Sequence, residues 1–258
     1  MDTTELGVAA DENLATAWAA LGRAMGADVI DDGPLTLVAS GIPIAFFNGA
    51  YVRDTSGNPD SMIADAIEFF ATRDLEWLLW VREGAAPNLL ESGRAAGLHD
   101  VGGPPAMGVT PIPPSPPAPS GLTIEIATTI EQLADHAAML REGFQIPQEV
   151  VDRLIRPALL DDPQLAVFVG RVAGEPVSGS LLAISGDTAG VYNVATPAEF
   201  RGRGYGAALT WAVIEEGARR GCTNAVLQAS QLGYPVYRRM GFVDLGAYVQ
   251  LHGPPFRS

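Results

Sequence analysis

The chain has 258 residues, of which 30 are acidic and 16 basic, giving a formal net charge of −14. All basic residues are arginine, which excludes the phosphate-loop lysine of Walker-type nucleotidases and the Schiff-base lysine of pyridoxal-phosphate enzymes. One cysteine and three scattered histidines leave little for a metal site and nothing for an internal disulfide, and the net acidity argues against nucleic acid as a partner.

The first half contains an alternating helix and strand pattern. Residues 61–71 predict a helix with one apolar face, 75–81 a buried strand, 89–96 a short helix and Ala106–Val109 a final strand. The same order recurs near the end of the chain, which indicates an internal duplication. Two unrelated α/β units would give a similar order, so that alternative stays open.

A proline-rich segment divides the chain. Six of the nine residues from Pro111 to Pro119 are proline, which predicts an extended, semi-rigid spacer. We therefore interpret residues 1–110 as one domain, 111–120 as a linker and 121–258 as a second domain. The first 120 residues contain 16 acidic residues and 5 arginines, whereas residues 121–258 contain 14 acidic residues and 11 arginines. The second domain is therefore less negative and tolerates an anionic ligand better.

The second domain predicts the order β-α-α-β-β-β-α-β-α-β. Its expected elements are strands over 122–127, 165–172, 177–184, 190–195, 225–229 and 242–251, and helices over 129–142, 147–160 and 204–220, with a short helix that starts near Pro235. Thr129 with Gln132 forms a capping-box pattern at the start of the first helix.

A glycine-rich turn lies between a strand and a helix of this domain. Glycines at 202, 204 and 206 leave room for consecutive backbone N–H groups to converge on one anion, and the helix N-terminus adds positive potential there. Arg201 and Arg203 can donate charge-assisted bonds to phosphate oxygens. Together these residues predict a pyrophosphate site that needs neither lysine nor metal.

The turn also fits the dinucleotide fingerprint G-x-G-x-x-[GA], but its context does not. The next strand ends in Gln228-Ala229-Ser230, without the acidic residue that would hold a ribose. Too few residues then remain for the further units of a doubly wound sheet. We therefore reject the dinucleotide interpretation.

Two motifs in register resemble another family. Arg201-x-x-Gly204-x-Gly206 resembles the [RQ]-x-x-G-x-[GA] loop of the GNAT superfamily of acyl-CoA N-acetyltransferases, and Tyr237-Arg-Arg-Met-Gly-Phe242 resembles its Tyr-x-x-x-Gly-Phe signature. One helix and one strand separate them, as in that superfamily. The resemblance covers about residues 121–253 and implies an α/β fold with a mixed sheet.

The first half resembles the superfamily only loosely. No Arg-x-x-Gly-x-Gly loop precedes its helix at Ser61, and Gly93 stands four residues before Gly97, where the signature tyrosine would be. The resemblance therefore implies tandem GNAT-like domains, the first a degenerate copy without a cofactor site.

What the resemblance implies is direct transfer of the acetyl group of acetyl-CoA to a primary amine in a ternary complex, without a metal. The strands ending at Val194 and Ala229 would splay to admit the pantetheine arm, and the Val194 N–H would bond the thioester carbonyl. Ser230 stands where many relatives have an asparagine. The implied cofactor-binding residues are Val194, Ala195, Thr196, Arg201, Gly202, Arg203, Gly204, Tyr205, Gly206, Ala207 and Ser230.

Tyr237 is the candidate general acid for the departing thiolate, because a phenol is protonated at neutral pH. A packed helix tyrosine is the other interpretation. No general base is identified: Asn193 cannot take a proton, and Glu142 and Glu149 are explained more simply as solvated charges at helix ends.

A non-catalytic acyl-CoA sensor or scaffold is the alternative function, and an acyl donor longer than acetyl is a further one. The acceptor, a small-molecule or peptide amine, is not identified, and a homodimer is left open because many relatives pair. No apolar run approaches the roughly 18 residues of a membrane span. Acids near the N-terminus replace the positive charge of a signal peptide, so we expect a cytoplasmic protein without a membrane partner.

Overall fold

The computed structural model describes residues 1–253. The predicted helices and buried strand of the first half correspond to α2, α3 and β4, whereas α1 and β1 to β3 are elements that the sequence patterns did not predict. In order, this half contains α1 (Thr3–Met25), β1 (Asp28–Ile30), β2 (Leu35–Ala39), η1 (Ala45–Phe47), β3 (Asn48–Val52), α2 (Pro59–Ala71), β4 (Leu78–Arg82), α3 (Pro87–Ala95), β5 (His99–Asp100) and β6 (Pro105–Val109).

The second half has the predicted order of helices and strands. The helix expected over 147–160 is wrong in length, because Pro157 holds Arg156 in an extended conformation and only a 3-10 turn follows. The elements are β7 (Leu122–Ile126), α4 (Ile130–Phe144), α5 (Gln148–Leu154), η2 (Pro157–Leu160), β8 (Leu165–Val172), β9 (Glu175–Ser185), β10 (Thr188–Ala195), η3 (Ala198–Phe200), α6 (Tyr205–Arg219), β11 (Asn224–Gln228), α7 (Tyr234–Arg239) and β12 (Val243–His252). The predicted capping box opens α4, with Thr129 and Gln132 bonded reciprocally.

The strands form one mixed sheet in the order β1-β2-β3-β4-β12-β6-β11-β10-β9-β8-β7, and β5 pairs with β12. Each half has one parallel pair joined by a helix, β3–α2–β4 in the first and β10–α6–β11 in the second. In each half a short helix follows, α3 or α7. The repeated order gives a tandem α/β fold, in agreement with the predicted duplication.

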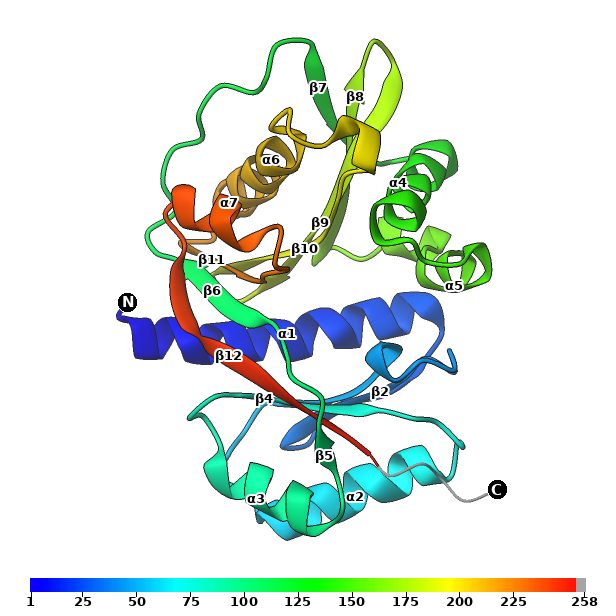
Figure 1. Ribbon diagram of the computed structural model, residues 1–258, viewed down its shortest axis with the longest axis vertical. Helices are drawn as coiled ribbons and strands as arrows, with labels where there is room; N and C mark the ends of the chain where they lie inside the picture. The colour runs from blue at the N-terminus through cyan, green and yellow to red at the C-terminus, as the bar shows by residue number, and fades with distance from the viewer. Residues whose placement is uncertain (254–258) are drawn as a thin grey trace.

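The last strands of the two halves are exchanged. β6 pairs with β11, so the strand predicted to complete the first half lies in the sheet of the second. β12 pairs first with β6 and then with β4, and its ribbon runs from the upper to the lower half in Figure 1. Placing Ala106–Val109 in the first domain's sheet is therefore wrong, because its neighbours are second-half strands. The division of the chain into residues 1–110, 111–120 and 121–258 stays a proposal, because the sheet of each half contains a strand from the other half.

Helix α1 lies between the two halves (Figure 1). Leu14 and Trp18 of this helix share one core with Tyr51 of the first half and Leu181 of the second. The side chain of Asn13 is fully buried and donates to the carbonyl oxygen of Ala183 at 3.0 Å. Both faces of α1 are therefore buried, and the helix joins the two halves into one body.

A nearly buried ion pair fixes the exchanged strand. The Arg82 guanidinium on β4 contacts the Asp11 carboxylate of α1 at 2.9 Å, and the Tyr248 hydroxyl on β12 donates to the same carboxylate at 3.0 Å. Burial raises the pKa of Asp11, and the Arg82 side chain opposes that rise. Three elements that are far apart in the chain, α1, β4 and β12, thus meet at one carboxylate.

The proline-rich segment is extended, as predicted, and it packs against the second half. The Ile112 N–H donates to the Thr223 carbonyl at 3.0 Å, and the Leu122 N–H donates to the Pro119 carbonyl at 3.1 Å. Between these points the chain passes along α6, so the segment covers that helix from outside (Figure 1).

Candidate acyl-CoA site

The parallel strands β10 and β11 separate before β10 ends. Their last pair is Val191 with Leu227, and only β9 accompanies the rest of β10. There the register shifts, so that Asn193 and Val194 stand opposite one residue of β9, which is a β-bulge, and Asn193 adopts a φ of 55°. The predicted separation is thus present in the backbone, with Val194 inside the bulge.

The glycine-rich turn is open and presents backbone N–H groups. Gly202 and Gly204 have φ values of 75° and 82°, which favour glycine, and residues 201–204 are exposed. Within residues 1–253, no backbone carbonyl accepts a hydrogen bond from the N–H groups of residues 202–207. The last three of these open α6, a helix of 15 residues without an acid in its first turn. Six consecutive donors thus lie at the positive end of a helix dipole, a geometry that suits a diphosphate.

Gly206 lets the helix approach the end of β10 closely. A Cβ atom at this position would stand 3.3 Å from Thr196 Oγ1 and 3.6 Å from Val194 Cγ1. Thr196 is in turn fixed by Ser178, whose hydroxyl lies 2.8 Å from Thr196 Oγ1 and donates to the Ala195 carbonyl at 2.9 Å. The turn and the bulge are therefore neighbouring parts of one site. The sequence reasoning missed Ser178, for which no motif gives a signal.

The two arginines of the turn hold backbone carbonyls. Arg201 donates to the carbonyl oxygens of Thr196 at 2.9 Å and Gly143 at 3.0 Å. Arg203 donates to the Glu199 carbonyl at 3.1 Å. The Arg201 guanidinium thus fastens the turn to the chain just after β10 and to the last turn of α4, and the expectation that Arg201 and Arg203 donate to phosphate stays a prediction.

Tyr237 lies on α7 against α6, with 8% of its surface exposed. Burial raises the pKa of Tyr237 to about 12, and the nearby Thr210 hydroxyl opposes that rise only in part. Thr210 itself donates to the Gly206 carbonyl at 2.9 Å, so the phenol is near the first turns of α6. A phenol in this environment stays protonated at neutral pH. Thr210 was missed by the sequence reasoning, although its i+4 spacing from Gly206 is a usable signal.

Ser230 has a local structural contact. Its Oγ accepts a hydrogen bond from the Gly233 N–H at 3.1 Å, and its carbonyl accepts from the Tyr234 N–H at 2.8 Å. The side chain therefore orders the turn that leads into α7. The structure places it between β11 and the helix that carries Tyr237.

The equivalent turn of the first half cannot bind an anion in this way. The Asn58 side chain accepts the Ser61 N–H at 3.0 Å, and Pro59 at the first helical position has no N–H. Asp60 adds negative charge in the first turn of α2. These three features explain physically why a degenerate copy would lack a cofactor site.

Other titratable groups are committed to packing. His136 is fully buried, which lowers its pKa to about 4, and its Nδ1 lies 3.2 Å from the Phe168 carbonyl. Cys222 is buried as well, and burial raises the pKa of its thiol. Among the described residues, no three His, Cys, Asp or Glu side chains gather as a metal site requires.

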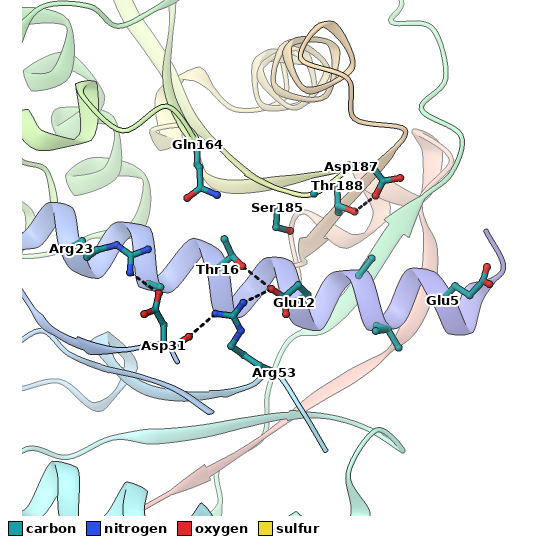
Figure 2. A pocket seen from close by; sticks show the side chains of 14 residues that line it. Glu5, Glu12, Thr16, Arg23, Asp31, Arg53, Gln164, Ser185, Asp187 and Thr188 are labelled. Atoms are coloured by element: carbon teal, nitrogen blue, oxygen red, sulfur yellow. Dashed lines mark hydrogen bonds and ion pairs between the residues drawn. The ribbon is translucent and has the colours of Figure 1, made fainter. Parts of the chain in front are cut away.

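A separate cavity of about 660 Å³ lies at the seam between α1 and the β9–β10 hairpin (Figure 2). Arg53 contacts Glu12 at 2.6 Å across it, and Arg23 contacts Asp31 at 2.7 Å. Thr188, which lines it, begins β10, whereas the bulge lies at the other end of that strand. The seam cavity is thus remote from the glycine-rich turn, and its charges are largely paired.

Residues 131–242 match the model of the Acetyltransferase (GNAT) family. This part of the chain belongs to the GNAT family. The matched range contains the bulge, the glycine-rich turn and Tyr237, and it excludes the proline-rich segment. No curated protein matches the sequence.

Solved structures show that the likeness of the fold extends over both halves. A GCN5-related N-acetyltransferase from Kribbella flavida superposes with a TM-score of 0.67 at 23% identity, covering 93% of this chain and 95% of that one. A GCN5-related N-acetyltransferase from Sphaerobacter thermophilus gives 0.63 at 18% identity, with 97% and 94% covered. A tandem GNAT protein from the clavulanic acid biosynthesis pathway gives 0.62 at 16% identity, with 87% and 79% covered. The chain therefore has a tandem GNAT fold.

Over residues 1–253, no helix combines the length and apolar character that crossing a bilayer requires.

Proposed function

We propose that this protein is an acyl-CoA-dependent N-acetyltransferase whose second half transfers the acetyl group of acetyl-CoA to a primary amine. The observation that carries the proposal is the run of N–H groups at residues 202–207, which have no backbone acceptor within residues 1–253 and extend from the exposed turn into the start of α6. Backbone donors suit a diphosphate in a chain that has no lysine. The GNAT match over the same residues supports the assignment.

Each residue of the site would have its own role. Acetyl-CoA would supply the acetyl group as a thioester. The N–H groups of 202–207 would bind its diphosphate, with Arg201 keeping the turn in shape. The Val194 N–H, in the bulge, would donate to the thioester carbonyl and stabilise negative charge that develops on its oxygen. Ala195 and Thr196 would line the path between these two points.

Tyr237 would act as the general acid. Its pKa of about 12 keeps the phenol protonated throughout the neutral range, so it can donate to the sulfur as the acyl bond to sulfur breaks. The attacking amine has to lose a proton, and no side chain is assigned to take it. A water molecule held by backbone groups is the proposed acceptor of that proton.

Ser230 and Arg203 would have secondary roles. Ser230 orders the turn before α7 and so would position Tyr237, while Arg203, which is bonded to the Glu199 carbonyl, would add positive potential near the diphosphate. The proposed domain arrangement gives the catalytic role to residues 121–258, with strand β6 supplied by the first half.

A non-catalytic acyl-CoA sensor would use the same turn, and no observation favours it over catalysis. The test has two parts. Calorimetry with CoA measures binding at the turn, and a thiol-release assay with acetyl-CoA across polyamines, aminoglycosides, amino acids and peptides measures transfer. CoA binding with acylated product supports the enzyme, and CoA binding without product from any amine supports the sensor. The absence of CoA binding removes both.

A further inference from the structure

A hollow of about 290 Å³ lies between the proline-rich segment, which precedes the residues that match the GNAT model, and α6, which lies within them. Residues 115–119 form one wall, and Trp211 and Ala208 of α6 form the opposite wall. Gly204, a member of the glycine-rich turn, lies at one end, and Glu215 lies at the other end of the α6 wall. The volume suits one ring system and is small for a whole cofactor.

The outer wall is held in place. The Ile112 N–H is bonded to the Thr223 carbonyl, and at the other end Pro119 accepts from the Leu122 N–H in the turn that leads into β7. Proline fixes φ along most of the stretch between them. Pro119 Cγ stands 3.5 Å from the position that a Cβ of Gly204 would occupy. The wall therefore begins at the diphosphate turn itself.

The chemistry of the hollow selects an uncharged aromatic group. Its lining is mostly apolar and includes no arginine, while the carboxylate of Glu215 would repel a phosphate. Trp211 is half-buried, so one part of its ring is accessible for stacking. A group that stacks and offers an N–H donor to Glu215 or Ser115 fits these features best.

We propose that this hollow binds the adenine base of the acyl-CoA donor, which stacks on Trp211 beneath the proline-rich wall and donates from its exocyclic amine to Glu215. This inference rests on the proposed function. It follows from connectivity, because the adenosine of CoA is attached to the diphosphate that the 202–207 amides would bind. The proline-rich linker is then part of the cofactor site rather than only a spacer.

Fluorescence and calorimetry test the proposal without any acceptor amine. Of the four tryptophans, Trp18, Trp77 and Trp80 are buried in the first half, so Trp211 is the one that reports on the hollow. CoA should quench its emission, whereas 4′-phosphopantetheine, which lacks the nucleoside and one phosphate of the diphosphate, should not quench it even at concentrations where calorimetry shows it bound. Trp211→Phe should bind CoA as the parent does and lose the quenching.

Affinities give the second measurement. Trp211→Ala should weaken CoA about tenfold by the loss of base stacking and leave 4′-phosphopantetheine unchanged. A CoA analogue with hypoxanthine in place of adenine should bind about tenfold more weakly than CoA, because its carbonyl faces Glu215. Glu215→Gln should remove most of that preference, since an amide can donate to the carbonyl.

Failure of this inference is distinguishable from failure of the proposed function. If CoA binds the parent and Trp211→Ala equally, or if the hypoxanthine analogue binds as well as CoA, the base lies elsewhere and the inference is wrong, while the proposed activity stands. If neither CoA nor 4′-phosphopantetheine binds the parent protein, the proposed function fails first. The melting temperature of Trp211→Ala, compared with that of Trp211→Phe, reports any loss of folding.

Discussion

Replacement of Tyr237 by phenylalanine separates chemistry from packing. The ring packs against Phe242 with centroids 5.9 Å apart, and phenylalanine keeps that contact while it removes the hydroxyl. The contribution of a positioned general acid is typically about 10²- to 10⁴-fold. A thiolate is a fairly good leaving group even without protonation, so we expect the low end, a fall in kcat of about 10²-fold.

The assay is thiol release at saturating acetyl-CoA and amine, with CoA affinity measured separately by calorimetry. The variant should keep its CoA affinity within about twofold, because the diphosphate donors are on α6 and not on α7. Since burial raises the pKa of Tyr237 to about 12, its ionisation should not lower the parent rate below about pH 11. An unchanged kcat, or a CoA affinity that falls as far as kcat does, would refute the role of general acid.

Three further predictions concern the glycine-rich turn, the Arg82–Asp11 ion pair and the buried His136. Arg201→Ala should raise the KM for acetyl-CoA about fivefold with little change in kcat, because the turn loses its hydrogen bonds to the Thr196 and Gly143 carbonyls. Steady-state kinetics measures both constants. A fall in kcat alone would contradict the prediction. Arg82→Met should lower the free energy of unfolding by about 3 kcal/mol, because the nearly buried Asp11 carboxylate loses its partner. Urea denaturation measures this free energy. A change below about 1 kcal/mol would contradict a stabilising role for the ion pair. His136 is neutral in the folded protein, and between pH 6.5 and about 4 only the unfolded chain binds a proton at this residue. The free energy of unfolding should therefore fall by up to about 3 kcal/mol as the pH drops through this range. His136→Gln should have a weaker dependence of the unfolding free energy on pH, and an equal dependence in both proteins would contradict this role of His136.

Local patterns predict most of the second half. Apolar runs interrupted by glycine and proline give β8 and β9, and the capping box at Thr129 gives the start of α4. The glycine spacing gives the open turn before α6, because the left-handed φ values at Gly202 and Gly204 require glycine. The function of a side chain within the turn is less predictable: Arg201 binds backbone carbonyls that are distant in sequence, such as that of Gly143.

Helix α1 is a missed element. It is buried between two halves, and its buried residues include consecutive ones such as Trp18, Ala19 and Ala20, so they do not lie on one stripe. Its ends do carry signals, a capping box at Asp2 and Glu5 and a left-handed Gly26. The exchange of β6 and β12 leaves no local trace, because a strand has the same pattern whichever sheet it joins.

The central claim is that backbone amides at the mouth of α6 bind the diphosphate of an acyl-CoA. Proline at position 207 is tolerated in the first turn of a helix but removes one of these six N–H groups, whereas serine there keeps it. Calorimetry with CoA should therefore show an affinity about tenfold weaker for Ala207→Pro and nearly unchanged for Ala207→Ser. Equal affinities for the two variants would contradict the claim.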